Sequence, residues 1–130
     1  MPLLAKMKLI KVICRPEKTI ELKDALTKLG YHGITFKTNL GFGEQRKKIK
    51  QVFRGKIYEK RVDITKRAEL EFVVADYRVE RVIETIRSIA ATEEEGDGRI
   101  YVFPIESAIH IHSGDRHLGD SSETGFSGDI

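Results

Sequence analysis

Two glycine-rich turns in this 130-residue chain have the composition of an anion site. The first runs from Gly41 to Gly43, and the second runs from Gly96 to Gly98 and is followed directly by Arg99. Glycine allows backbone N–H groups to approach an anion closely, and an adjacent arginine adds a full positive charge. Together the two turns predict a phosphate cradle, although the need for a tight turn also explains a glycine at each position.

The segment from Gly41 to Arg61 carries most of the positive charge. It holds eight lysines and arginines against two glutamates, a net charge of +6, whereas the whole chain has a net charge of +3. The remaining residues therefore carry −3, so a mildly acidic body bears one strongly basic projection. Few aromatic residues stand among these cations, which argues against stacking on nucleic-acid bases. The segment favours docking on a protein surface, and no nucleic-acid partner is expected.

Hydrophobic periodicity predicts the elements that must position these stretches. Strands are expected over residues 7–15, 34–40 and 62–75, where apolar and β-branched residues alternate or run together. Helices are expected over about 18–29 and 79–90, because their apolar residues recur at helical spacing, and Gly30 ends the first of them. Two short strands are expected at 100–103 and 107–112, separated by Pro104.

The order of these elements is a weak internal repeat, strand–helix–strand twice, with the basic segment at its midpoint. It predicts an α+β fold, a ferredoxin-like βαββαβ sandwich with four main antiparallel strands, both helices on one face and a short C-terminal strand. The other face of the sheet needs a cover, which we expect a homo-oligomer to supply. Residues 1–114 are assigned to this domain, and residues 115–130 to a polar tail without regular structure.

Composition limits the class of protein. A length of 130 residues with 40% hydrophobic and 33% charged residues fits one globular domain. The lone cysteine, Cys14, lies in an apolar run and has no internal disulfide partner, which fits a reducing cytosol. Lysines interrupt the apolar residues near the N-terminus, so neither a signal peptide nor a membrane span is expected. The chain also lacks nucleophile–base spacing and paired carboxylates, so we expect a cytoplasmic protein that is not an enzyme.

Four short sequences within this frame resemble the PII nitrogen-regulatory signalling family, the GlnB/GlnK group. They are Arg15-Pro16, Gly-Phe-Gly-x-Gln at 41–45, Arg-Gly-x-x-Tyr at 54–58 and Gly-Asp-Gly-Arg-Ile-Tyr-Val at 96–102. Each is weak alone, but their order and spacing are specific. The resemblance implies a homotrimer with adenine-nucleotide clefts between subunits and long loops that dock on a target transporter or metabolic enzyme.

The resemblance also implies roles for individual residues. The nucleotide-binding positions that it implies are Gly41, Gly43, Gln45, Val73, Gly96, Asp97, Gly98, Arg99, His110 and His112. Gln45 would also help to hold Mg²⁺ and 2-oxoglutarate, whose carboxylate would pair with Arg67 or with the adjacent Lys66. Arg54 matches an arginine with which family members plug an ammonium channel. Tyr58 matches a tyrosine that some members carry as a uridylylation site, although an unmodified exposed tyrosine explains it equally well.

The chain also departs from the family pattern. His110 and His112 stand where members usually carry an Arg-x-Arg pair on the last strand. Residues two apart on a strand face the same way, so both imidazoles are expected to point into the cleft, where their partial charge would hold phosphate weakly and with a pH dependence. Glutamates replace a typical Gly-Lys-Ile at 93–95, and arginine replaces lysine at position 67. These changes weaken tight ATP binding and favour a divergent member that binds ADP or AMP, or another small effector.

The function expected from the sequence is therefore non-catalytic signalling in nitrogen or carbon metabolism. ATP or ADP, with AMP as a third candidate and 2-oxoglutarate as a second effector, would select the conformation of the basic loop. The alternative is a metal-responsive trimer that uses His110 and His112, but two histidines supply fewer ligands than a zinc ion takes.

Overall fold

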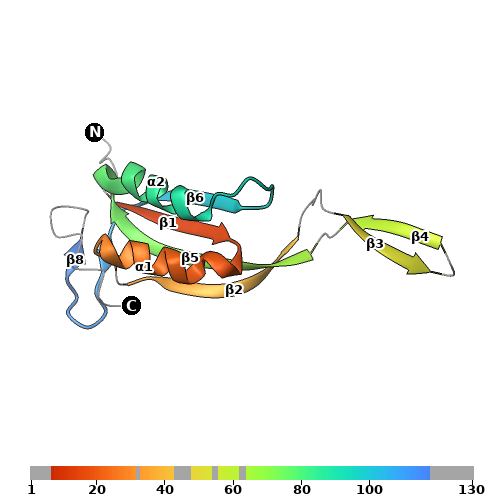
Figure 1. The fold of residues 1–130 in the computed structure, drawn as a ribbon. Coiled ribbons are helices and arrows are strands. Elements are labelled where there is room, and N and C mark those ends of the chain that lie inside the picture. The colour runs from red at the N-terminus through yellow and green to blue at the C-terminus, as the bar shows by residue number, and fades with distance from the viewer. Residues whose placement is uncertain (1–6, 32, 43–47, 54–55, 62–63, 118–130) are drawn as a thin grey trace.

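The computed structural model describes residues 7–31, 33–42, 48–53, 56–61 and 64–117. Four antiparallel strands form its central sheet in the order β2-β5-β1-β6 (Figure 1). Their bounds are Met7–Cys14 for β1, Thr35–Phe42 for β2, Ile64–Ala75 for β5 and Gly98–Ile105 for β6. The predicted α+β sandwich of four main strands is confirmed.

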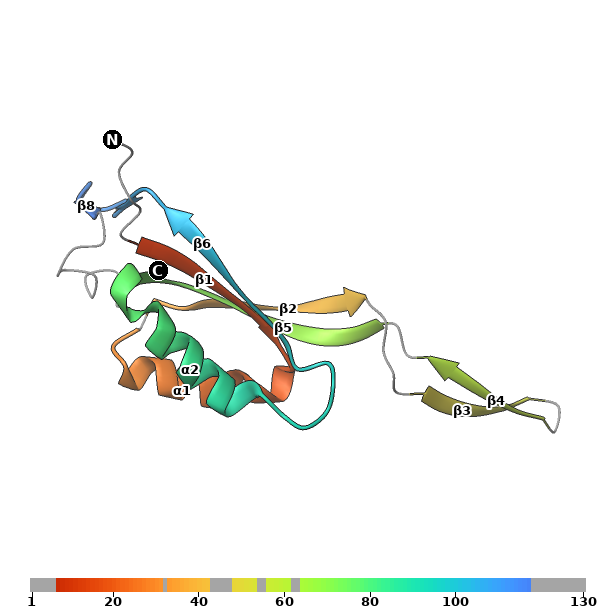
Figure 2. The same ribbon diagram turned by 90° about the horizontal axis from the view of Figure 1, so that it is seen from above.

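Two helices cover one face of this sheet (Figure 2). The short 3₁₀ turns η1 (Pro16–Lys18) and η2 (Asp76–Arg78) lead into α1 (Thr19–Lys28) and α2 (Val79–Ala90), close to the predicted bounds. The core lies between the helices and the sheet, and its most deeply buried side chains include Ile10, Val12, Cys14, Leu22, Leu26, Leu70, Val74, Val82 and Ile86. Cys14 is thus a buried core residue, as its apolar surroundings predict.

Gly30 ends α1 by a Schellman motif. Its φ of +102° is one that glycine adopts at little cost. The Tyr31 amide donates to the Leu26 carbonyl, and the Gly30 amide donates to the Thr27 carbonyl, both at 3.0 Å. These two bonds satisfy carbonyls that the helix end would otherwise leave open. The predicted helix stop at Gly30 is confirmed.

The sheet face away from the helices carries a charged cluster at its centre. Glu69 is only 7% exposed and accepts a hydrogen bond from Asn39 Nδ2 at 2.6 Å. Its carboxylate also lies 3.2 Å from Lys11 Nζ and 3.8 Å from Lys37 Nζ. Lys11 further contacts Glu71 at 3.3 Å. In Figure 2 both described helices lie on the other face, so within the part of the chain that the structure describes no helix covers this charged face.

The basic segment contains two strands that the sequence did not predict. Strands β3 (Lys48–Phe53) and β4 (Lys56–Arg61) pair with each other in an antiparallel hairpin beyond the end of the main sheet (Figures 1 and 2). The β-branched and aromatic residues among the cations favour extended backbone, and Lys50 stands opposite Glu59 in the register. Part of the segment that the sequence analysis describes only as a basic loop is therefore a regular hairpin.

The C-terminal strands also differ from the prediction. β6 continues through Pro104 to Ile105, because it is an edge strand, where proline is tolerated. The strand expected over 107–112 is reduced to β7 (Ala108–Ile109), which pairs with β8 (Arg116–His117). His110 and His112 therefore lie at the turn between these strands, so the expectation that both share one strand face is wrong. No described helix is long and apolar enough to cross a membrane.

Candidate functional site

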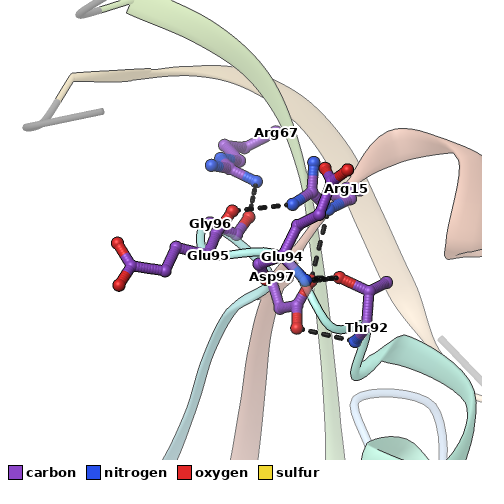
Figure 3. A network of polar contacts seen from close by, with 7 residues as sticks. All are labelled: Arg15, Arg67, Thr92, Glu94, Glu95, Gly96 and Asp97. Carbon is purple, nitrogen blue, oxygen red and sulfur yellow. Dashed lines mark hydrogen bonds and ion pairs between the residues drawn. The ribbon is translucent and has the colours of Figure 1, made fainter. Parts of the chain in front are cut away.

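Gly41, which lies near the end of β2 and not in a turn, and the glycine turn at Gly96–Gly98 come together at one end of the sheet, where Arg67 of β5 contacts both. Gly41 stands opposite Thr65 in the β2–β5 register, and a β-carbon at position 41 would lie 2.8 Å from Arg67 Cγ. From the same strand, Arg67 Nη1 donates a hydrogen bond of 2.6 Å to the Gly96 carbonyl (Figure 3). Three predicted site residues from distant parts of the sequence thus form one group.

Asp97 holds the second glycine turn closed from within. Its carboxylate accepts hydrogen bonds from the Thr92 amide at 2.7 Å and from the Thr92 hydroxyl at 2.5 Å. Bonds from the Thr92 hydroxyl and amide, with a smaller contribution from Arg15, hold the pKa of Asp97 below its usual value. Because this carboxylate is bonded inside the turn (Figure 3), it shapes the loop on which the backbone amides are carried.

Arg15 and Thr92 are residues of this network that the sequence analysis did not assign to the site. Arg15 donates from Nη2 to the Glu95 carbonyl at 2.9 Å and from Nε to Asp97 at 3.4 Å. The signal for Arg15 was its place directly after the first strand, within a motif that was used only to detect resemblance. Thr92 stands five residues before Asp97, and no spacing rule singles it out.

Replacing Asp97 by alanine is expected to lower the free energy of unfolding by about 1–2 kcal/mol, because the substitution removes a charged acceptor that is bonded to Thr92 and Arg15. The pKa of Asp97 is lowered in the folded state, so its stabilisation is present above the unfolded pKa and is lost as the pH falls through the folded value. Urea unfolding at pH 7 and pH 3 measures both effects. Glu93→Ala, in the same exposed stretch, is the control, and an equal loss in both variants would contradict the assignment.

A cavity of about 530 Å³ lies behind the turn, between β1, β6 and α2. Its lining is apolar along Val12, Ile83 and Ile100, and polar where Thr92 and Arg99 contribute. Arg67 does not line it. Arg99 contributes to this lining, but it stands opposite Ile13, and Ile13 stands opposite Glu69, so the Arg99 side chain belongs to the same face of the sheet as Arg67.

Other predicted site residues lie away from the group that Gly41, Arg67 and Gly96 form within the described part of one chain. Val73 is half-buried on the same face as Arg67, but six residues along β5, about 20 Å at the rise of a strand. Lys66 is exposed and points to the opposite face from its neighbour Arg67. Gly43, Gln45 and Arg54 lie outside the described residues, as does the side chain of Tyr58.

Both histidines lie between β7 and β8, at the opposite end of the main sheet from the loop that joins α2 to β6 (Figure 1). His110 is half-buried and His112 is exposed. The turn that carries them is closed by hydrogen bonds from the His110 amide to Asp115 and from the Gly114 amide to His110, of 2.9 and 2.8 Å. Among the residues with described side chains, no group of three or more histidine, cysteine, aspartate or glutamate residues is arranged to hold a metal ion.

Comparison with known proteins gives consistent matches over most of the chain. The family model for nitrogen regulatory protein P-II matches residues 7–115. Nitrogen regulatory protein P-II of Rhodospirillum rubrum is 43% identical over 110 residues, which cover 85% of this chain and 96% of that protein. Nitrogen regulatory protein GlnK2 of Haloferax mediterranei is 38% identical over 108 residues, covering 83% and 85%.

Solved structures agree with these matches. The GlnK–ATP complex of B. subtilis superposes with a TM-score of 0.70 at 28% identity, covering 90% of this chain and 97% of that chain. Arabidopsis thaliana PII bound to citrate gives a TM-score of 0.68 at 31% identity, covering 87% and 90%.

Proposed function

The chain belongs to the nitrogen regulatory protein P-II family, and from this membership we propose that it binds an adenine nucleotide at clefts between its subunits. The family is regulatory, which confirms the expectation of a signalling protein and not an enzyme. The proposed ligand is ATP or ADP, with AMP as a third candidate.

The glycine turn at Gly96–Gly98 is the observation that carries the nucleotide proposal. Its backbone is fixed by side chains of Arg15, Arg67 and Thr92, and the exposed Arg99 follows it directly. A turn that is already ordered can present amides to a phosphate without a further loss of conformational entropy. The similar GlnK of B. subtilis has been solved as a complex with ATP, which supports the choice of an adenine nucleotide.

A homotrimer is the assembly that we propose. Within one chain the histidine turn and the glycine turn lie at opposite ends of the sheet, so a shared site needs a second subunit (Figure 1). The uncovered sheet face, with Tyr101 and Phe103 beside the charged cluster, offers a surface that neighbouring subunits would bury. His110 and His112 of one subunit would then face the glycine turn of the next.

The second effector that we propose is a small carboxylate such as 2-oxoglutarate, bound at Arg67. The similar PII of Arabidopsis thaliana has been solved with citrate, a carboxylate. A cytoplasmic transporter domain or metabolic enzyme would be the target, and the hairpin β3–β4 would be the part that meets it. Mg²⁺ would be held in part by Gln45, and no other step of the proposal depends on the metal.

Calorimetric titration with ATP, ADP and AMP tests the nucleotide proposal. We expect at least one nucleotide to bind, and a His110→Ala, His112→Ala double variant to bind it about tenfold more weakly, since each phosphate contact contributes about 1 kcal/mol or more. Size-exclusion chromatography of the double variant is the control that its assembly is unchanged. No heat with any nucleotide at millimolar concentration would overturn the proposal.

A further inference from the structure

The cavity between β1, α2 and β6 has the size of a small-molecule site. Its volume of about 530 Å³ lies within the usual range of ligand pockets, about 300–1,000 Å³. Its apolar wall is formed by Val12, Ile83, Ile86, Ala90 and Ile100. These side chains offer no hydrogen bond, so a ligand held against them needs an apolar body.

This space lies on the helix side of the sheet, away from the group around Arg67. Val12 and Cys14 of β1 belong to the core beneath the helices, and Ile100 stands opposite Val12 in the β1–β6 register. Ala68 of β5 is also a core residue, so the side chain of its neighbour Arg67 points to the other face. The cavity is therefore not a continuation of the carboxylate site proposed at Arg67.

Arg87 gives the open side of the cavity a positive charge. It is exposed and lines the cavity one helical turn after Ile83. Among the described residues, no hydrogen bond or ion pair engages its guanidinium. Asp97 also lines the cavity, but its carboxylate is bonded to Thr92 and Arg15. An uncommitted guanidinium can bind both oxygens of a carboxylate.

The surroundings of Arg87 favour an anion on the cavity side of the helix. Burial raises the pKa of the Cys14 thiol, so this group stays neutral at pH 7 and does not repel an anion. The hollow on the other side of Arg87 differs, because Glu80 and Glu84 line it. A bound anion is therefore expected on the side of Ile86, away from both glutamates.

We propose that this cavity binds a small amphiphile that consists of an apolar chain and a carboxylate. The chain would lie between α2 and β6, and the carboxylate would pair with Arg87. A medium-chain fatty acid has this chemistry. The site is separate from the proposed nucleotide cleft, and its existence does not depend on that cleft.

Calorimetry with decanoate and decanol tests the charge of the ligand, since the two share one chain. We expect the assembled protein to bind decanoate with a Kd of about 1 mM or lower. Decanol should bind about tenfold more weakly, because it lacks the charge-assisted bond. Arg87→Gln should weaken decanoate binding about tenfold and leave decanol binding unchanged. Arg81→Gln, at an exposed arginine of α2 that does not line the cavity, is the matched control and should change neither.

Ala91→Phe tests the location of the chain. Ala91 lines the cavity, is exposed and has extended backbone with φ −74° and ψ 133°, so a larger side chain fits the fold. Phenylalanine would fill part of the cavity without changing any charge. Both ligands should therefore bind about tenfold more weakly or worse, since their apolar contacts are lost.

Methyl NMR of the isoleucines separates binding in the cavity from adsorption on the surface. Decanoate should shift the signals of Ile83, Ile86 and Ile100, which line the cavity. It should not shift those of Ile20 and Ile109, which are 73% and 52% exposed elsewhere.

Three results would overturn the inference while leaving the proposed function intact. They are equal shifts at all five isoleucines, unchanged decanoate binding in Arg87→Gln, and displacement of decanoate by ATP, which would assign the cavity to the nucleotide. No decanoate binding by the assembled protein would also overturn it. Titration of the same sample with nucleotide reports on the proposed function separately.

Discussion

Replacing Gly98 by alanine is expected to destabilise the fold by about 3 kcal/mol or more, because it combines backbone strain with a steric overlap. Gly98 has a φ of +111°, which residues with a side chain rarely adopt. A β-carbon there would overlap the Ile13 carbonyl oxygen and lie 2.7 Å from the carbonyl carbon. Both atoms belong to the backbone of a central strand, so neither can move away cheaply. The start of β6 would have to separate from β1.

Gly30→Ala is the control that separates the two causes. Gly30 has a similar φ of +102°, but a β-carbon there would meet nothing within 4 Å. Its substitution should cost only about 1 kcal/mol of backbone strain. Urea unfolding of both variants at one protein concentration measures the difference, since the stability of an oligomer depends on concentration. Equal losses would show that the close approach of Gly98 to β1 contributes nothing.

The fold was largely predictable because its local signals agree with one another. Apolar spacing located both helices, and Gly30 located the end of the first. The errors arose where the location of a strand in the sheet decides its structure. Pro104 is tolerated because β6 lies at an edge, and edge status depends on the pairing of strands far apart in sequence. The β3–β4 hairpin was missed because dense positive charge hides its β-forming residues.

The site was predictable only in part, because many of its contacts also join residues that are far apart in the sequence. Residues 96–99 were recognisable because glycine and arginine stand together in the sequence. Arg15 lies directly after β1 and Arg67 lies on β5, and they reach the same turn over separations of 80 and 29 residues. Side-chain bonds over such separations follow no sequence spacing. The histidine pair lies on a turn and not on a strand, because β7 is only two residues long. Its place in the proposed nucleotide site would depend on a second subunit.

The contacts of Glu69 also could not be predicted from sequence spacing, and they imply a large contribution to stability. Sequence alternation shows only that Glu69 faces away from Leu70, yet its carboxylate is nearly buried and accepts from Asn39 while contacting Lys11 and Lys37. Replacing it by alanine leaves Lys37 and Asn39 without this acceptor. We expect a loss of about 2 kcal/mol at pH 7, the usual range for bonds to a charged group.

The pH dependence tests the origin of this loss. Burial alone would raise the pKa of Glu69, but the hydrogen bond from Lys11 and the charge of Lys37 together lower it below its usual value. A group with a lowered folded pKa stabilises the protein above the unfolded pKa, which is about 4.3 for glutamate, and this stabilisation is lost as the pH falls through the folded value. The difference in free energy of unfolding between the unmodified protein and Glu69→Ala, measured by urea unfolding, should therefore be smaller at pH 3 than at pH 7.

Glu71→Ala is the comparison that assigns the effect to the buried carboxylate. Glu71 also contacts Lys11, but its side chain is 33% exposed, and its loss should cost less than about 1 kcal/mol. The assignment of the effect to the buried carboxylate would be contradicted if both variants lost the same free energy of unfolding. It would also be contradicted if the destabilisation by Glu69→Ala did not change with pH. Because Glu69 lies at the centre of the face that a homotrimer would bury, its variant should also dissociate at a higher protein concentration than Glu71→Ala. Sedimentation at several concentrations measures that order.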